Sequence, residues 1–288
     1  GTKTKTVTWL ITTFSDAILK KVIEFALNEQ GPPPVSFAFI TLGSEGRQEQ
    51  TLKTDQDNAI IFEDMDPGTG LTEEAVQHYF LELGEKICLW LDQAGYDLCL
   101  GGIMASNEKW CQPLSTWKRY FTKWIRTAEP ENLLHTTIFF DFRHAHGDKN
   151  LTEELRLHLV HSLKARSGFL RFMTQNSLGF RPPIGFLGNF LMESKGTHKK
   201  TLDIKTCMAP MVDFARIYSL KNGIIQTNTQ SRLYQLYIKG VLDREVYNEI
   251  EQAYSFLLQL RFMRQIHAIL GENIKPDNYI HPKKLSEI

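Results

Sequence analysis

The sequence has few cysteines, no excess of either charge and no long apolar run. It contains four cysteines in 288 residues, none at C-x-x-C spacing, which argues against a zinc site and indicates a reducing compartment, the cytoplasm. Basic and acidic residues both number 33, so sequence-independent binding of nucleic acid is not expected. No apolar run reaches the roughly 18 residues of a membrane helix, and no signal peptide is recognisable. The sequence therefore predicts a cytoplasmic protein without a nucleic-acid or membrane partner.

The opening stretch has the apolar spacing of an amphipathic helix. Apolar residues recur at three- and four-residue steps over 7–29, and Gly31 followed by three prolines ends the pattern. The chain begins without Met, so we expect it to be part of a longer protein, with this helix leading to an upstream sensor domain. The apolar positions are Val7, Leu10, Ile11, Phe14, Ile18, Val22 and Phe25.

The rest of the chain divides into an α/β half and a helical half. Thr72 and Thr152 are predicted N-caps of helices. Beyond Gly147 the apolar residues recur with helical spacing only. We predict an α+β fold with a linker helix over 1–29, a mixed-sheet α/β domain over 30–149 and an all-helical domain over 150–288. Within the α/β domain, strands are predicted over 35–42, 56–62, 97–100 and 136–143, and helices over 72–94 and 113–126.

The most informative segment joins the first predicted strand to the second. The first strand ends in a Gly43-Ser44 turn, and Asp55 and Asp57 open the second strand. Side chains alternate along a strand, so two acids separated by one residue project from the same face. Two such carboxylates repel each other unless a cation binds them, and oxygen ligands with open positions suit Mg²⁺ or Mn²⁺. The pair predicts a metal site, with a solvated acidic turn as the alternative.

Small and basic residues near the acid pair predict a phosphate site. Gly43 lets backbone N–H groups approach a phosphate closely, and Ser44 adds a hydroxyl. Arg47 offers a guanidinium that binds phosphate through two N–H groups. Lys53 is a further candidate for a phosphate contact, with a solvated loop lysine as the alternative. A phosphate cradle beside a metal-binding acid pair is the equipment of nucleotidyl transfer.

These residues resemble a known family. The segments 43–50 and 54–58 are similar to the motif of polymerase-β-type nucleotidyltransferases. The resemblance is greatest to a bacterial group of nucleotidyltransferases of signalling proteins, related to PII-protein uridylyltransferases and glutamine-synthetase adenylyltransferases, which often follow cyclic-nucleotide-binding and CBS domains. Further similar segments are 101–107, 140–143, 147–148, 202–205, 213–216, 228–229, 232–233, 260–261 and 276–278.

The resemblance implies a third carboxylate that completes the metal site. Asp141 is the first choice, because it is predicted to lie in an apolar strand, where an unpartnered Asp is costly, and because Arg143 follows it as in the adenylyltransferases. An ion pair between Asp141 and Arg143 is the alternative. Asp97 is the rival candidate, and the position that carries a carboxylate in the antibiotic-transferase branch corresponds here to Cys99.

The implied activity is metal-dependent transfer of an NMP from an NTP to a hydroxyl. The acceptor would be a protein of signal transduction, as for the PII uridylyltransferases. A catalytically weak or inactive nucleotide-binding regulatory module is the alternative, and a helical interaction domain on an α/β scaffold is a third interpretation. The catalytic and metal-binding residues implied are Asp55, Asp57 and Asp141, and the nucleotide-binding residues are Gly43, Ser44, Arg47 and Lys53.

Two other clusters carry weaker predictions. Trp110, Trp117 and Trp124 follow one another at seven-residue steps, which predicts packing on one helix face. A basic stretch could contact a triphosphate or an acidic partner, with a solvated loop as the alternative. Its residues are Lys195, His198, Lys199, Lys200 and Lys205.

Overall fold

The computed structural model describes residues 2–65, 68, 70–127, 130–166, 168–180 and 201–282. Its backbone forms two packing units. The predicted basic stretch lies outside the described residues, apart from Lys205 in an exposed helical turn. The sheet unit comprises Leu10–Gln50 and Thr54–Phe169, and the C-terminal unit comprises Gly1–Trp9, Thr51–Lys53 and Leu170–Ile288.

Four short strands form the mixed sheet of the sheet unit: β1 (Phe37–Thr41), β2 (Asn58–Phe62), β3 (Cys111–Pro113) and β4 (Arg143–Gly147). Their order is β3-β2-β1-β4, with β1 antiparallel to β2 and β4, and β2 parallel to β3. Every residue of β1 and β2 is buried, because both faces of the sheet are covered. The first two predicted strands and the mixed sheet are thereby confirmed.

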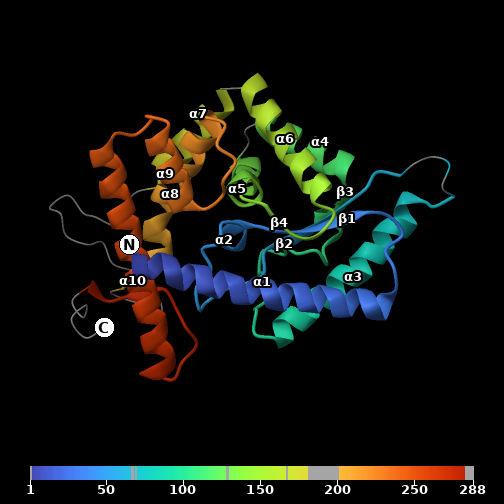
Figure 1. Ribbon diagram of the computed structural model, residues 1–288, viewed down its shortest axis with the longest axis horizontal. Helices are drawn as coiled ribbons and strands as arrows, with labels where there is room; N and C mark the ends of the chain where they lie inside the picture. The colour runs from blue at the N-terminus through green and yellow to red at the C-terminus, as the bar shows by residue number, and fades with distance from the viewer. Residues whose placement is uncertain are drawn as a thin grey trace. The chain divides into compact units, whose positions relative to one another are not determined.

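Helices cover both faces of this sheet (Figure 1). α1 and α3 share one hydrophobic core with Phe39 and Phe62, while α4 and α6 pack on the other side. Thr72 caps α3 as predicted, by accepting a hydrogen bond from the Ala75 N–H. Helix α6 belongs to the sheet unit, although it follows the predicted domain boundary at residue 149. The helices are α1 (Thr2–Gln30), α3 (Glu73–Gln93), α4 (Leu114–Thr127), α5 (Pro130–Phe139) and α6 (Lys149–Ala165).

Three local predictions were wrong. The segment predicted as a strand over 136–143 ends helix α5, turns, and enters β4 at Arg143, because a short apolar run is compatible with a buried helix as well as with a strand. The strand predicted over 97–100 is reduced to an isolated bridge between Asp97 and Asp55. α6 is capped by Asp148, whose carboxylate accepts from the Asn150 N–H, whereas Thr152 lies inside the helix.

The three tryptophans pack in the core, but not on one helix face as predicted, because Trp110 lies outside the helix that carries the other two. Trp117 and Trp124 are buried on α4, and the Trp110 ring lies 6.1 Å from Trp117 and 6.5 Å from Trp124, centroid to centroid. Trp110 precedes α4, in the 3-10 turn η1 (Glu108–Trp110). The Trp117 indole N–H donates to the Ile60 carbonyl, 3.0 Å away, which ties α4 to β2. This aromatic cluster therefore belongs to the core on the α4 side of the sheet.

α1 is confirmed as a helix, but its packed face is not the one that the apolar spacing marks. Leu19, Ile23 and Ala26 enter the core. Phe14 and Phe25, two of the periodic apolar residues, are 68% and 60% exposed. The face toward the protein also buries small hydroxyl residues in the first half of the helix. These residues are Thr4, Thr8, Thr12 and Ser15.

The C-terminal unit is mainly helical, with a short strand pair. Leu233 and Leu236 pack with Ala215 and Leu242 in a small core, where α8, α9 and α10 meet. Strands β5 and β6 pair antiparallel. Within the parts of the chain that the structure describes, no helix is long and apolar enough to cross a bilayer. The elements are α7 (Gly168–Gly179), β5 (Leu202–Asp203), α8 (Ile204–Lys221), α9 (Thr229–Ile238), α10 (Arg244–Leu270) and β6 (Tyr279–Ile280).

Candidate active site

Asp55 and Asp57 flank the buried residue Gln56 in the chain that leads into β2. Gln56 between them is buried, and its amide N–H₂ donates to the carbonyls of Cys88 and Tyr96, both at 2.9 Å. With Gln56 anchored inward, alternation predicts that the two flanking carboxylates point outward, and both residues are half-buried. Sequence analysis predicted the shared face from spacing alone; the anchoring role of Gln56 had no recognisable signal.

The Gly43-Ser44 turn lies directly against Asp57. It forms the short helix α2 (Gly43–Gly46), and Gly43 has a φ of +54°, a conformation that favours glycine. A Cβ placed on Gly43 would lie 2.7 Å from Asp57 Oδ2, so the carboxylate occupies the space that the missing side chain leaves. The backbone joins the same two segments, because the Leu42 N–H donates to the Asp57 carbonyl at 2.8 Å.

Glu45 is a buried acid beside this pair that sequence analysis did not consider. Burial raises the pKa of Glu45 to about 8, Arg143 opposes the rise, and Asp16, Asp57 and Asp55 add to it. Both carboxylates of the pair thus lie within electrostatic reach of one side chain on α2. A single Glu between small residues gives no sequence signal of burial, which is why it was missed.

Arg47 and Asp141 form an ion pair in the interior. Arg47 Nη1 lies 3.0 Å from Asp141 Oδ2, and its Nε lies 2.8 Å from Glu49 Oε2. Asp141 is fully buried, and its carbonyl lies 2.0 Å from where a Cβ on Gly46 would be, at the other end of α2 from Asp57. In this geometry Arg47 secures the turn through two acids, and Asp141 is closed to solvent.

The alternative ion pair considered for Asp141 is not formed. Arg143 instead donates from Nη1 and Nη2 to both carboxylate oxygens of Asp16, at 2.9 and 2.7 Å, and so ties β4 to α1. Asp141 lies in the turn before β4 rather than within a strand, so the two side chains do not share a strand face. The roles predicted for Asp141 in metal binding and for Arg47 in phosphate binding stay predictions.

Asp97, the rival third carboxylate, lies beside the acid pair. It is exposed and bridged in parallel to Asp55, and its carbonyl accepts from the Gln56 N–H at 2.9 Å. Residues directly opposite each other in such a bridge project from the same side. Cys99, two residues on, contacts Asp57: burial raises the pKa of its thiol, and the Asp57 carboxylate raises it further. The geometry therefore favours Asp97 over Asp141 as an acid reachable by a ligand.

Two predicted phosphate contacts have different surroundings. Ser44 is half-buried, and among the described residues none exchanges a hydrogen bond with its hydroxyl, which leaves that hydroxyl available to a ligand. Lys53 has an exposed side chain, and its segment Thr51–Lys53 belongs to the C-terminal unit. A hydrogen bond from the Leu52 N–H to Gln265 Oε1, at 3.0 Å, holds this segment there. The phosphate contact of Lys53 stays a prediction.

The donor set fits a hard divalent cation that takes further ligands from a substrate. Across the ranges described, no three His, Cys, Asp or Glu side chains form a metal cluster by themselves. Asp55 and Asp57 offer two carboxylates, and the absence of a side chain at Gly43 leaves room for the carboxylate of Asp57. One or two carboxylates, completed by phosphate oxygens and water, are the usual protein ligands of nucleotide-bound Mg²⁺.

A mixed sheet that holds a glycine–serine turn against an acid pair is the arrangement expected of nucleotidyltransferases. Two family models match the chain. Residues 1–131 match "Putative nucleotidyltransferase DUF294", and residues 167–288 match "Putative nucleotidyltransferase substrate binding domain". The chain belongs to this family, as its sequence resemblance indicated. Asp55, Asp57 and Asp97 lie inside the first matched segment, and Asp141 lies in neither. No curated protein matches.

Proposed function

We propose that this protein is a metal-dependent nucleotidyltransferase that moves an NMP from an NTP to a hydroxyl of a protein acceptor in signal transduction. The observation that carries the proposal is Asp57 Oδ2 against Gly43, next to the buried Gln56 that separates Asp57 from Asp55. The family supports a transferase in general terms. Metal dependence and the protein acceptor are expectations of the resemblance.

Each side chain has a role that its surroundings allow. The acid pair holds Mg²⁺ or Mn²⁺, which when bound offsets the negative charge of the triphosphate. The Ser44 hydroxyl and the turn at Gly43 bind phosphate oxygens, and the buried Arg47 ion pairs keep that turn in place. Asp97 is better placed than Asp141 to take a proton, because it is exposed beside Asp55.

The reaction exchanges a phosphoanhydride bond of the NTP for a phosphate ester bond on the acceptor. The acceptor oxygen bonds to the α-phosphorus of the NTP while the bond from the α-phosphorus to the departing pyrophosphate breaks. The hydroxyl proton passes to a carboxylate, for which we propose Asp97, and from there to water. The chain's own contribution is to position the triphosphate and the proton acceptor, which is the main source of rate in phosphoryl-type transfers.

The test is pyrophosphate release from each of the four NTPs with Mg²⁺ or Mn²⁺, with peptides that contain Tyr and Ser as acceptors. Wild type is expected to turn over, and the double variant Asp55→Asn/Asp57→Asn to lose at least about a hundredfold. Asp92→Asn, an exposed acid on α3, is the matched control and should retain activity. Wild-type protein that binds no NTP in the presence of metal would overturn the proposal.

A non-catalytic nucleotide-binding regulatory module is the second candidate. It is favoured by the absence, in the part of the chain that the structure describes, of a third acid close enough to complete a metal cluster with the pair. This alternative predicts calorimetric NTP binding that Asp55→Asn weakens, with no pyrophosphate released on any acceptor. Turnover by the wild type that is lost in the double variant excludes it.

A further inference from the structure

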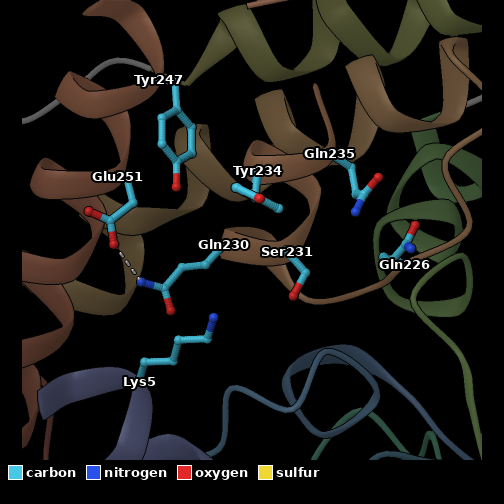
Figure 2. A pocket seen from close by; sticks show the side chains of 8 residues that line it. All are labelled: Lys5, Gln226, Gln230, Ser231, Tyr234, Gln235, Tyr247 and Glu251. Atoms are coloured by element: carbon cyan, nitrogen blue, oxygen red, sulfur yellow. Dashed lines mark hydrogen bonds between the residues drawn. The ribbon is translucent and has the colours of Figure 1, made fainter. Parts of the chain in front are cut away.

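A cavity of about 450 Å³ lies in the C-terminal unit, and none of the residues assigned above lines it. It is lined mainly by side chains of α9 and α10, and Lys5 from the first turns of α1 completes the lining (Figure 2). All of these residues belong to one packing unit. The volume is within the range of small-molecule sites in proteins.

Gln230 is fixed so that it presents an acceptor to this cavity. Its amide nitrogen donates to Glu251 Oε1 and to Ser255 Oγ, both at 3.0 Å, and Ser255 in turn donates to Glu251 at 2.9 Å. Both N–H groups are used, so the amide oxygen is left for a ligand, and it points to the side where Lys5 lies (Figure 2). An amide that is buried and oriented in advance binds a ligand donor without further ordering.

Two tyrosines form an aromatic corner in the same cavity. The rings of Tyr234 and Tyr247 are 6.3 Å apart at an angle of 61°, and Tyr237 stacks on Tyr247 at 5.0 Å, which holds that ring in place. The Tyr247 hydroxyl points toward the space above Gln230 (Figure 2). Tyr234 remains half-exposed, so its ring is open to a flat partner. Planar ligands with a π-face stack on such rings.

The charges argue against a polyphosphate ligand. Among the lining residues the cavity has one base, Lys5, and one acid, Glu251, so it has no excess positive charge with which to bind several phosphates. The other polar groups include Gln226 and Gln235, and a side-chain amide both donates and accepts, as the edge of a nucleobase does. A flat, uncharged heterocycle with hydrogen-bonding edges matches this set of groups.

We propose that this cavity binds a nucleoside, with its base in the corner of Tyr234 and Tyr247 and a donor of the ligand on the Gln230 amide oxygen. The site is built from the C-terminal unit alone and does not depend on the activity proposed for Asp55 and Asp57. It would give the protein a second ligand site that recognises the base rather than the phosphates.

The test uses the full chain without metal and measures binding by calorimetry and by saturation-transfer NMR. The probes are adenosine, guanosine, cytidine and uridine. Ribose and inorganic tripolyphosphate test whether the cavity recognises the sugar or phosphates instead of the base. At least one nucleoside should bind at millimolar concentration or below, and neither ribose nor tripolyphosphate should displace it. Equal binding of ribose, binding of tripolyphosphate alone, or no binding of any nucleoside overturns the proposal.

Variants separate this site from a general change in the fold. Tyr234→Ala should weaken nucleoside binding about tenfold or more, because a base–aromatic stack is lost, while Tyr234→Phe should retain it. Phe256→Ala, which removes an exposed aromatic side chain of α10 outside the cavity, is the matched control. The Asp55→Asn/Asp57→Asn variant should bind the nucleoside as wild type does. Nucleoside binding at this cavity is therefore tested independently of the proposed transferase activity. Unchanged binding by Tyr234→Ala contradicts the assignment.

Discussion

Asp57 Oδ2 occupies the place next to Gly43 that any side chain at residue 43 would need. The oxygen lies 2.7 Å from the ideal Cβ position, closer than real Cβ contacts allow. Because Gly43 also has a φ of +54°, two separate constraints require glycine there. The turn and Asp57 therefore depend on each other for their geometry, across the loop that separates them in the sequence.

Gly43→Ala should displace the Asp57 carboxylate. We expect a loss of about 1–2 kcal/mol in the free energy of unfolding from backbone strain, and at least a tenfold loss of Mn²⁺ and NTP affinity. Chemical denaturation and calorimetry measure the two effects. Gly168→Ala is the matched control, because nothing lies within 4 Å of its Cβ position. Unchanged Mn²⁺ affinity in a folded Gly43→Ala protein would contradict the assignment of Asp57.

The two candidates for the third carboxylate should separate by stability. Asp141→Asn removes one of the two acids that pair with Arg47, whose side chain is only 14% exposed. The buried positive charge is then only partly neutralised, so the substitution should cost about 3 kcal/mol of unfolding free energy. Asp97→Asn changes an exposed group and should cost less than about 0.5 kcal/mol while lowering pyrophosphate release about a hundredfold. Urea denaturation and the pyrophosphate assay measure both. A stable Asp141→Asn protein without turnover would instead identify Asp141 as the third carboxylate.

Stability should depend on pH through Glu45. Burial raises its folded-state pKa from an ordinary value of 4.5 to about 8, with Asp16, Asp57 and Asp55 adding to the rise and Arg143 opposing it. Below 4.5 the carboxyl is protonated in both states. As the pH rises from 4.5 to about 8, the unfolded chain loses a proton that the folded chain keeps, so this contribution to stability declines and then levels off.

Glu45→Gln removes that titration. The free energy of unfolding of the variant, relative to wild type, should therefore be higher at about pH 9 than at about pH 5. Denaturation curves at the two pH values measure the difference. Glu85→Gln, an exposed residue of α3, controls for the loss of a carboxylate and should show no such rise. A parallel pH dependence of wild type and Glu45→Gln would show that Glu45 is ionised in the folded protein.

The α+β class could be predicted from the sequence, because it follows from periodicity and alternation within short segments. The shared face of Asp55 and Asp57 rests on the same alternation and stays a prediction. It could not reveal which partner a charged side chain chooses. Arg47 pairs with Asp141, 94 residues away, and Arg143 with Asp16, 127 residues away. Such pairs depend on how segments that are distant in the sequence pack together, which no local pattern encodes. Apolar spacing likewise marked a face on α1 without showing whether that face is packed.

The two faces of α1 allow a prediction with the same chemical change on each. Ile23 is fully buried against the sheet unit, whereas Ile18 is 38% exposed, and both lie in the middle of the helix. Ile23→Ala should cost about 2–4 kcal/mol of unfolding free energy, since it leaves a cavity in the core. Ile18→Ala should cost less than about 1 kcal/mol, since water already reaches that side chain. Urea denaturation of the two variants, with helix content checked by circular dichroism, gives the comparison; equal losses would mean that the outward face of α1 is covered in solution.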